Sequence, residues 1–130
     1  MNAEELKNRS KKFSLRIFKL VAALPNSVQG RAIGSQLIRC GTSVAANYRA
    51  ACRARSKAEF VVKIGLVEEE ADESAFWLEL LIEANLIKSD LLAPLLQETR
   101  ELVAIIAASK ITASGRVHRS QIANRKSQIS

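Results

Sequence analysis

Residues 56–81 read SKAEFVVKIGLVEEEADESAFWLELL, and this stretch decides the fold class. It opens with a capping box: the Ser56 hydroxyl is placed to accept from the Glu59 amide, and the Glu59 carboxylate to accept from the Ser56 amide. Beyond the box, apolar residues recur at intervals of three and four, the period of one helix face. That stripe comprises Phe60, Ile64, Val67, Ala71, Leu78 and Leu81. The stretch therefore predicts a long helix from Ser56 to about Leu86.

The same helix carries a second apolar group, about 120° or more around its axis from the first. Its members are Val62, Leu66, Trp77 and Leu80. A helix in a small bundle needs one apolar face for the core, so the second face is a candidate subunit interface, with Trp77 as its anchor. The alternative is that both faces contact neighbouring helices within a single thick core.

Two further helices are predicted before this one. From Glu4 to Leu24 apolar residues recur at helical spacing, and Pro25-Asn26-Ser27 ends this helix and caps the next. The second helix is expected from about Val28 to Ala54. Its apolar stripe is Ile33, Leu37, Cys40, Val44, Tyr48 and Ala51. Three glycines within it, each costly in a helix, indicate either the close approach of a neighbouring helix or chance tolerance. They are Gly30, Gly34 and Gly41.

On the other side, Ser89-Asp90 caps a fourth helix that should run to about Ser109. The composition then changes, because residues 110–130 hold five of the twenty Lys and Arg residues and none of the thirteen acids. The sequence thus predicts an all-α protein with a four-helix bundle domain at residues 1–109. Residues 110–130 are predicted to be a disordered basic tail.

Charge is divided between the two halves of the bundle. The net charge of the chain is +7, but without the tail it is 15 minus 13, or +2. Residues 7–63 contain thirteen basic residues and one acid, whereas residues 66–101 contain ten acids and two bases. The two halves either pair with each other, within one bundle or between subunits, or the basic half forms a surface for phosphates.

Arginines on the second helix favour a phosphate-binding surface. Arginine presents fork-shaped donors to phosphate oxygens, and small neighbouring residues let a nucleic-acid backbone come close. The candidate contacts to RNA or DNA are Arg31, Arg39, Arg49, Arg53 and Arg55. The alternative is a solvated arginine face that is neutralised by the next helix, since a hairpin about Arg55 would bring Arg39 near Asp72 and Glu73.

Asn47 and the two cysteines have structural interpretations. Asn47 lies at the edge of the core stripe, where a buried amide needs partners, so a hydrogen bond between helices is favoured over ligand contact. Cys40 and Cys52 are twelve residues apart on one predicted helix. This is about 18 Å along the axis, so they cannot pair with each other and are expected to be reduced.

Residue types that carry catalysis are sparse. The only histidine, His118, lies in the tail, and no Glu-x-x-His pair typical of di-metal bundles occurs. No glycine-rich phosphate loop is present either. We therefore expect no catalytic residue, no metal, no cofactor and no enzymatic activity. Because no stretch approaches about 20 uncharged apolar residues and no signal peptide is evident, we expect a cytoplasmic protein without a membrane span.

Residues 43–60 closely resemble a known bacterial family. The resemblance rests on a Ser-Val pair, an Asn three residues on, and then Arg-Ser-x-x-Glu-Phe. The matching residues are Ser43, Val44, Asn47, Arg55, Ser56, Glu59 and Phe60. The family is the four-helix bundle family named for proteins encoded in intervening sequences of large-subunit ribosomal RNA genes. The resemblance covers about Phe13 to Ser109.

This resemblance implies an up-down antiparallel bundle, a homo-oligomer that is a pentamer in some members, and no enzyme activity. A related group, the accessory proteins of diversity-generating retroelements, is similar in fold and binds nucleic acid and a protein partner through a basic surface. This chain departs from the commoner family pattern at Arg49-Ala50-Ala51, where many members have a Glu-Gly pair. We expect a self-associating bundle that binds nucleic acid through its first two helices. The alternative is a protein assembly scaffold without a nucleic-acid role.

Overall fold

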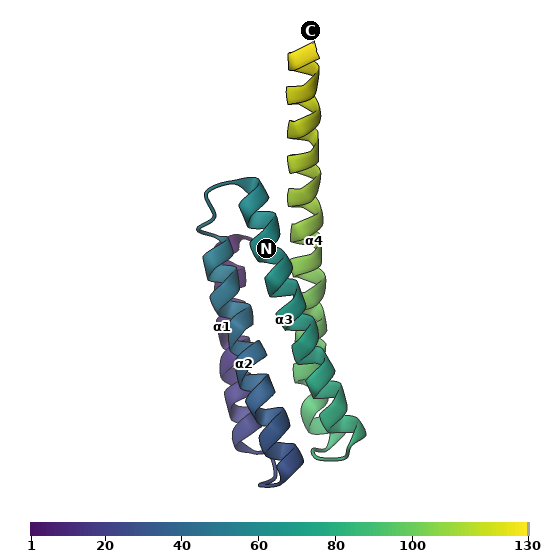
Figure 1. Ribbon diagram of the computed structural model, residues 1–130. Coiled ribbons are helices and arrows are strands. Elements are labelled where there is room, and N and C mark those ends of the chain that lie inside the picture. Colours follow the sequence, from purple (N-terminus) through teal and green to yellow (C-terminus); the bar gives the residue numbers. More distant parts are fainter. Residues whose placement is uncertain (130) are drawn as a thin grey trace.

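The computed structural model describes the backbone of residues 1–129 and the side chains of residues 1–115 and of Ile122. Four helices follow one another along the chain: α1 (Ala3–Ala22), α2 (Val28–Ala51), α3 (Lys57–Glu83) and α4 (Ser89–Ile129). No strand occurs in residues 1–129. Each helix packs against the next, and α1 also contacts α4, so the chain is an up-down antiparallel four-helix bundle (Figure 1). The all-α prediction is confirmed.

The first three helices begin where the sequence supplies a polar capping side chain. Asn2, Ser27 and Ser56 accept hydrogen bonds from the amides of Glu5, Gly30 and Glu59 at 2.8, 3.0 and 3.1 Å. At its other end, α3 stops at Glu83, slightly before the predicted Leu86. Asn85 takes a left-handed φ of 55° there, and the Leu86 amide donates to the Leu81 carbonyl at 3.0 Å. This turn satisfies carbonyls that the helix end leaves free.

The predicted apolar stripes form the core. Every helix contributes at least one completely buried side chain to it. Examples are Ile17 of α1, Leu37 of α2, Ile64 and Leu78 of α3, and Leu102 of α4. Because each helix turns one stripe inward, the four helices share a single core.

Close packing of α1 on α2 explains two of the helical glycines. A Cβ atom added at Gly41 would lie 3.0 Å from Cγ1 of Ile17, and one added at Gly34 would lie 3.1 Å from Cγ1 of Val21. The Ser14 hydroxyl donates to the Gly41 carbonyl at 3.0 Å. The close approach of a neighbouring helix is therefore the interpretation that the structure supports.

The fourth helix is longer than predicted. It continues past Ser109, the predicted end, and Figure 1 shows α4 running beyond the other three helices. Residues 110–115 are helical and Ala113 is buried, because α4 still packs against the end of the bundle there. The predicted tail of residues 110–130 thus does not begin at Lys110. The rest of the predicted disordered tail, residues 116–130, lies outside the part of the chain whose side chains the structure describes, apart from Ile122.

Candidate nucleic-acid interface

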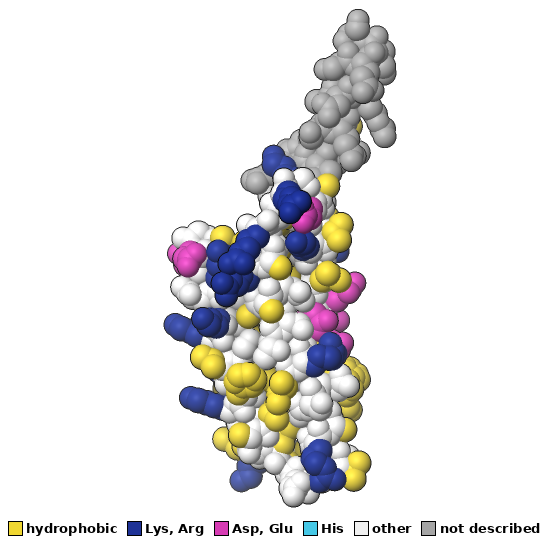
Figure 2. Space-filling model, turned by 60° about the vertical axis from the view of Figure 1, so that its left-hand side comes forward, with side chains coloured by type: hydrophobic (Ala, Val, Ile, Leu, Met, Phe, Trp, Pro, Cys, Tyr) yellow, Lys and Arg dark blue, Asp and Glu magenta, His cyan; other side chains and the backbone are white. Residues whose placement is uncertain are grey.

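A cleft between α1 and α2 gathers four cationic side chains. Lys7 and Lys11 come from α1, and Arg49 and Arg53 from the end of α2. The cleft has a volume of about 390 Å³. The other lining residues are Glu4, Asn8, Ala45 and Ala46. Figure 2 shows this face, with Lys and Arg side chains gathered in its upper part and hydrophobic side chains in its lower part.

The antiparallel arrangement of α1 and α2 brings these residues together. The start of α1 lies beside the end of α2, so Lys7 and Lys11 face Arg49 and Arg53. Lys7 and Lys11 are four residues apart, which places them one turn apart on the same side of α1. Arg49 lies in the last turn of α2, and Arg53 lies in the turn that directly follows this helix. The small side chains of Ala45 and Ala46 leave the hollow between the two pairs.

The cleft has an excess of positive charge. Its only carboxylate, Glu4, lies 3.7 Å from the Lys7 ammonium. Within residues 1–115, no carboxylate oxygen lies within 4.0 Å of the charged groups of Lys11, Arg49 or Arg53. Four cations against one anion give the cleft a formal charge of +3. Three of its cations are thus available to an external anion.

Arg39 is engaged inside the bundle. Its guanidinium donates to Glu70 at 3.2 Å and to Glu73, both on α3, and to Gln36 at 3.2 Å. The hairpin prediction was right about Glu73, whereas Asp72 is exposed and takes no part. For this arginine the structure supports the neutralised face, because two carboxylates already occupy its donors.

Arg31 and Arg55 lie apart from the cleft. Arg31 is near the start of α2, at the opposite end of the bundle, where its guanidinium donates to the Asn26 side chain at 2.8 Å. Arg55 lies in the loop between α2 and α3 and lines a different groove. Of the five predicted arginines, only Arg49 and Arg53 therefore come together. Lys7 and Lys11 were not predicted individually, because the sequence does not show which turn of α1 lies beside which turn of α2.

The second apolar group of α3 is partly exposed. Val62 and Leu66 are 68% and 47% exposed, so this half of the face lies outside the core. Trp77 and Leu80 are half-buried and pack against the core. The Trp77 indole donates to Glu73 at 3.1 Å. Phe76, which the sequence reasoning missed, is 52% exposed and meets the Trp77 ring edge-on with centroids 4.9 Å apart.

Ser56, Glu59 and Asn47 were predicted to have structural roles. Ser56 caps α3 as predicted, but the Glu59 carboxylate accepts from the Arg55 amide at 3.0 Å instead of the Ser56 amide. That hydrogen bond and Lys63, at 3.1 Å, lower the pKa of Glu59. Asn47 is half-buried on α2, and within residues 1–115 no hydrogen bond joins its side chain to another helix. The structural role predicted for Asn47 stays a prediction.

Two polar contacts join different helices of the bundle. Arg9 on α1 donates to both oxygens of Glu98 on α4, at 2.9 and 2.6 Å, and to Glu101 at 2.9 Å. These hydrogen bonds lower the pKa of Glu98. In the core, the Ser74 hydroxyl donates to the Cys40 sulfur at 3.2 Å. Burial raises the pKa of Cys40, so it remains a neutral thiol.

The described residues contain neither a membrane-spanning helix nor a metal-binding cluster. None of their helices is long and apolar enough to cross a membrane. Among the same residues, no group of three or more His, Cys, Asp or Glu side chains is placed to hold a metal ion.

The fold and its charged faces define a small up-down helical bundle with a cationic cleft. This chain belongs to the 23S rRNA-intervening sequence protein family, whose model matches residues 4–108. It is similar to a crystal structure from Bacteroides thetaiotaomicron, described as a protein with unknown function from the S23 ribosomal protein family. The two are 31% identical with a TM-score of 0.78, and the match covers 85% of this chain and 98% of the other. None of the curated proteins matches this chain.

Proposed function

We propose that this protein is a non-enzymatic binding module that self-associates and binds the backbone of a nucleic acid through α1 and α2. The observation that carries the proposal is the cleft in which Lys7, Lys11, Arg49 and Arg53 converge. Helices α1 and α2 hold Lys7, Lys11 and Arg49, and the turn directly after α2 holds Arg53, so their backbone positions are fixed before a ligand arrives. Preorganised cations lose less conformational entropy on binding phosphate than the same cations on a mobile loop.

The chemistry of the cleft suits phosphates more than bases. Arg49 and Arg53 supply forked donors that match phosphate oxygens, and the lysines add point charges. The alanines between them let a sugar-phosphate backbone approach the helix surface. No aromatic side chain lines the cleft, so stacking on bases is not part of the proposed binding mode. Backbone contacts of this kind give affinity without reading a base sequence.

Structured RNA is the first ligand to test. The family description refers to an intervening sequence of 23S rRNA, and the similar Bacteroides thetaiotaomicron protein is assigned to a ribosomal protein family. Duplex DNA is the second ligand to test. A protein distinguishes RNA from DNA by contacts to the ribose 2′-hydroxyl, and a cleft that contacts only phosphates would make no such contact.

Fluorescence anisotropy of labelled structured RNA and duplex DNA, titrated at two salt concentrations, tests the proposal. The test variant is Arg49→Gln/Arg53→Gln, and the matched control is Arg100→Gln with Lys88→Gln, which removes two charges outside the cleft. Each lost phosphate contact should reduce the slope of log K against log salt by about 0.7–0.9. The test variant should therefore bind more weakly and with a shallower slope than the control. Equal binding by the two variants would contradict the proposal.

Self-association is supported by a different observation. The outer face of α3 leaves Val62, Leu66 and Phe76 substantially exposed, although each could pack against an apolar partner. Sedimentation velocity over a range of protein concentrations tests this part. If the protein assembles but binds neither RNA nor DNA at low salt, it is the alternative assembly scaffold, in which the oppositely charged halves of the bundle serve only protein contacts.

A further inference from the structure

Two exposed faces of the bundle carry opposite charges around apolar side chains. The first, called the α1 face, consists of Lys12, Leu15, Phe18 and Lys19, and its two apolar side chains are 54% and 46% exposed. The second, called the α3 face, consists of Asp72, Phe76, Leu80 and Glu83. Each face by itself leaves apolar side chains in water between two like charges.

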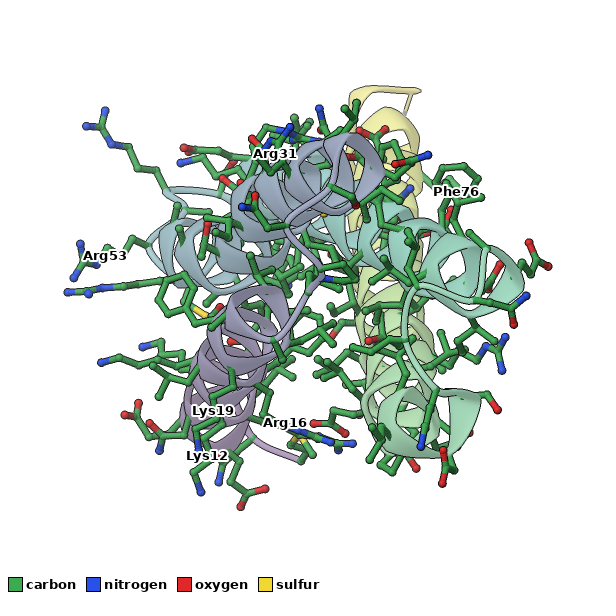
Figure 3. All side chains as sticks on the ribbon, turned by 90° about the horizontal axis from the view of Figure 1, so that it is seen from below. Lys12, Arg16, Lys19, Arg31, Arg53 and Phe76 are labelled. Atoms are coloured by element: carbon green, nitrogen blue, oxygen red, sulfur yellow. The ribbon has the colours of Figure 1, made fainter. Side chains whose placement is uncertain are left out.

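The two faces point away from each other. Figure 3 looks along the bundle and shows Lys12 and Lys19 projecting outward from α1, while Phe76 projects outward from α3 on the opposite side. This follows from the order of helices around the bundle, in which α2 packs between α1 and α3. One copy therefore cannot bring its own two faces together.

The two faces also lie at the same height along the bundle. The Ser14 hydroxyl donates to the carbonyl of Gly41 at 3.0 Å, and the Ser74 hydroxyl donates to the sulfur of the preceding residue, Cys40, at 3.2 Å. Ser14 and Ser74 therefore lie near the same height, on either side of the middle of α2. Because α1 and α3 run in the same direction with the same rise per residue, the residues around these two serines stay at similar heights along both helices.

The two faces therefore overlap in height. The α1 face runs from two residues before Ser14 to five after it, and the α3 face runs from two residues before Ser74 to nine after it. Glu79 is engaged by Arg100 at 3.4 Å, which leaves Glu83 as the exposed carboxylate at that end.

We propose that a second copy of this chain docks its α1 face on the α3 face of the first. This rests on the self-association proposed above and adds which surfaces meet. Two α1 faces would oppose their lysines, and two α3 faces their carboxylates, so only the unlike pair places opposite charges together. A polyanion would be repelled by the α3 face. Since each copy keeps one free face of each kind, the contact is head-to-tail, and repetition gives a closed ring or an open chain.

Phe76 is held ready for such a contact. Its ring rests edge-on against Trp77, whose indole is tied to Glu73. Glu73 in turn accepts from Arg39 of α2. Because these contacts restrain the neighbouring ring, less side-chain freedom remains to be lost when a partner covers Phe76.

Sedimentation velocity on charge-reversed full-length chains tests the pairing. One variant carries Lys12→Glu and Lys19→Glu, a second carries Asp72→Lys and Glu83→Lys, and a third carries all four changes. We expect the native chain to assemble, each two-residue variant to be at least tenfold weaker in association, and the four-residue variant to recover. Circular dichroism at low protein concentration checks that each variant keeps its helical content.

A matched control carries Lys57→Glu and Lys88→Glu, two reversals just before or at the start of a helix, where a carboxylate is tolerated. This control should assemble like the native chain. If the native chain is a monomer at every concentration, the proposed self-association itself fails. If it assembles but the reversals change nothing, or the four-residue variant does not recover, the pairing of these two faces is wrong while self-association stands.

Discussion

The packing of α1 on α2 makes a sharp prediction for Gly41. Alanine normally favours a helix over glycine by about 1 kcal/mol. At Gly41 the added Cβ would lie 3.0, 3.2 and 3.4 Å from three carbon atoms of Ile17. Ile17 is fully buried and branched at Cβ, so its side chain strongly prefers one rotamer and has little room to move. We therefore expect Gly41→Ala to destabilise the protein despite the gain in helix propensity.

Gly65 provides the matched control. It is also within a helix, α3, but a Cβ added there would meet only the flexible Lys110 side chain, at 3.7 Å. Gly65→Ala should therefore stabilise the protein by about 1 kcal/mol. Because the propensity gain is common to both substitutions, the difference between them measures the overpacking cost, about 1–3 kcal/mol. Gly41→Ala should thus fall near or below the native stability.

Urea unfolding followed by circular dichroism measures both variants. The protein concentration is held fixed, since association changes the apparent stability. A third comparison uses Ile17→Ala: in that background Gly41→Ala should cost less than it does in the native chain, because the added methyl group enters vacated space. The reasoning is refuted if Gly41→Ala is as stable as Gly65→Ala, or if its cost is unchanged in the Ile17→Ala background.

Two further predictions concern helix ends and helix contacts. Ser56→Ala should lower the unfolding free energy by about 1 kcal/mol because it removes the cap of α3. Ser56→Asp should retain most of the native stability, because aspartate also caps helices. Equal losses for the two variants in thermal unfolding would contradict the capping role. The hydrogen bond from Arg9 lowers the pKa of Glu98 in the folded protein. The stability that this ion pair contributes is therefore fully present above the unfolded-state pKa of about 4.3, and it is lost as the pH falls through the lower pKa of the folded state. Between pH 5 and 3 the native chain should therefore lose more stability in urea titrations than Glu98→Gln, and parallel losses would show that this carboxylate is not the group responsible.

The helices could be predicted from the sequence because the signals that form them are local. The capping box at Ser56 and the stripe through Ile64 each depend on residues within a few turns, so the start of α3 and its buried face were both predicted. The end of α4 was missed for a related reason. Residues 110–115 have few large apolar groups, and only the neighbouring end of the bundle buries Ala113.

The candidate site was only partly predictable because it joins two helices. A helical wheel places Arg39 and Arg49 on one stripe, but it does not show that Glu70 and Glu73 of another helix engage the first and not the second. The register between α1 and α2, set by the close packing at Gly41, decides which lysines join the arginines. Local spacing carries no information about that register.

The placement of charge links the two proposals. A polyanion in the cleft contacts the end of the bundle that holds Lys7 and Arg53, whereas Leu15 and Phe18 of the α1 face lie further along α1 toward its end. Added salt weakens both interactions, but only the assembly contact includes exposed apolar side chains, whose burial does not depend on screening. Salt should therefore release nucleic acid before it dissociates the assembly. Simultaneous measurement of anisotropy and sedimentation across a salt series would detect this order, and the reverse order would show that the faces proposed here are not the ones that meet.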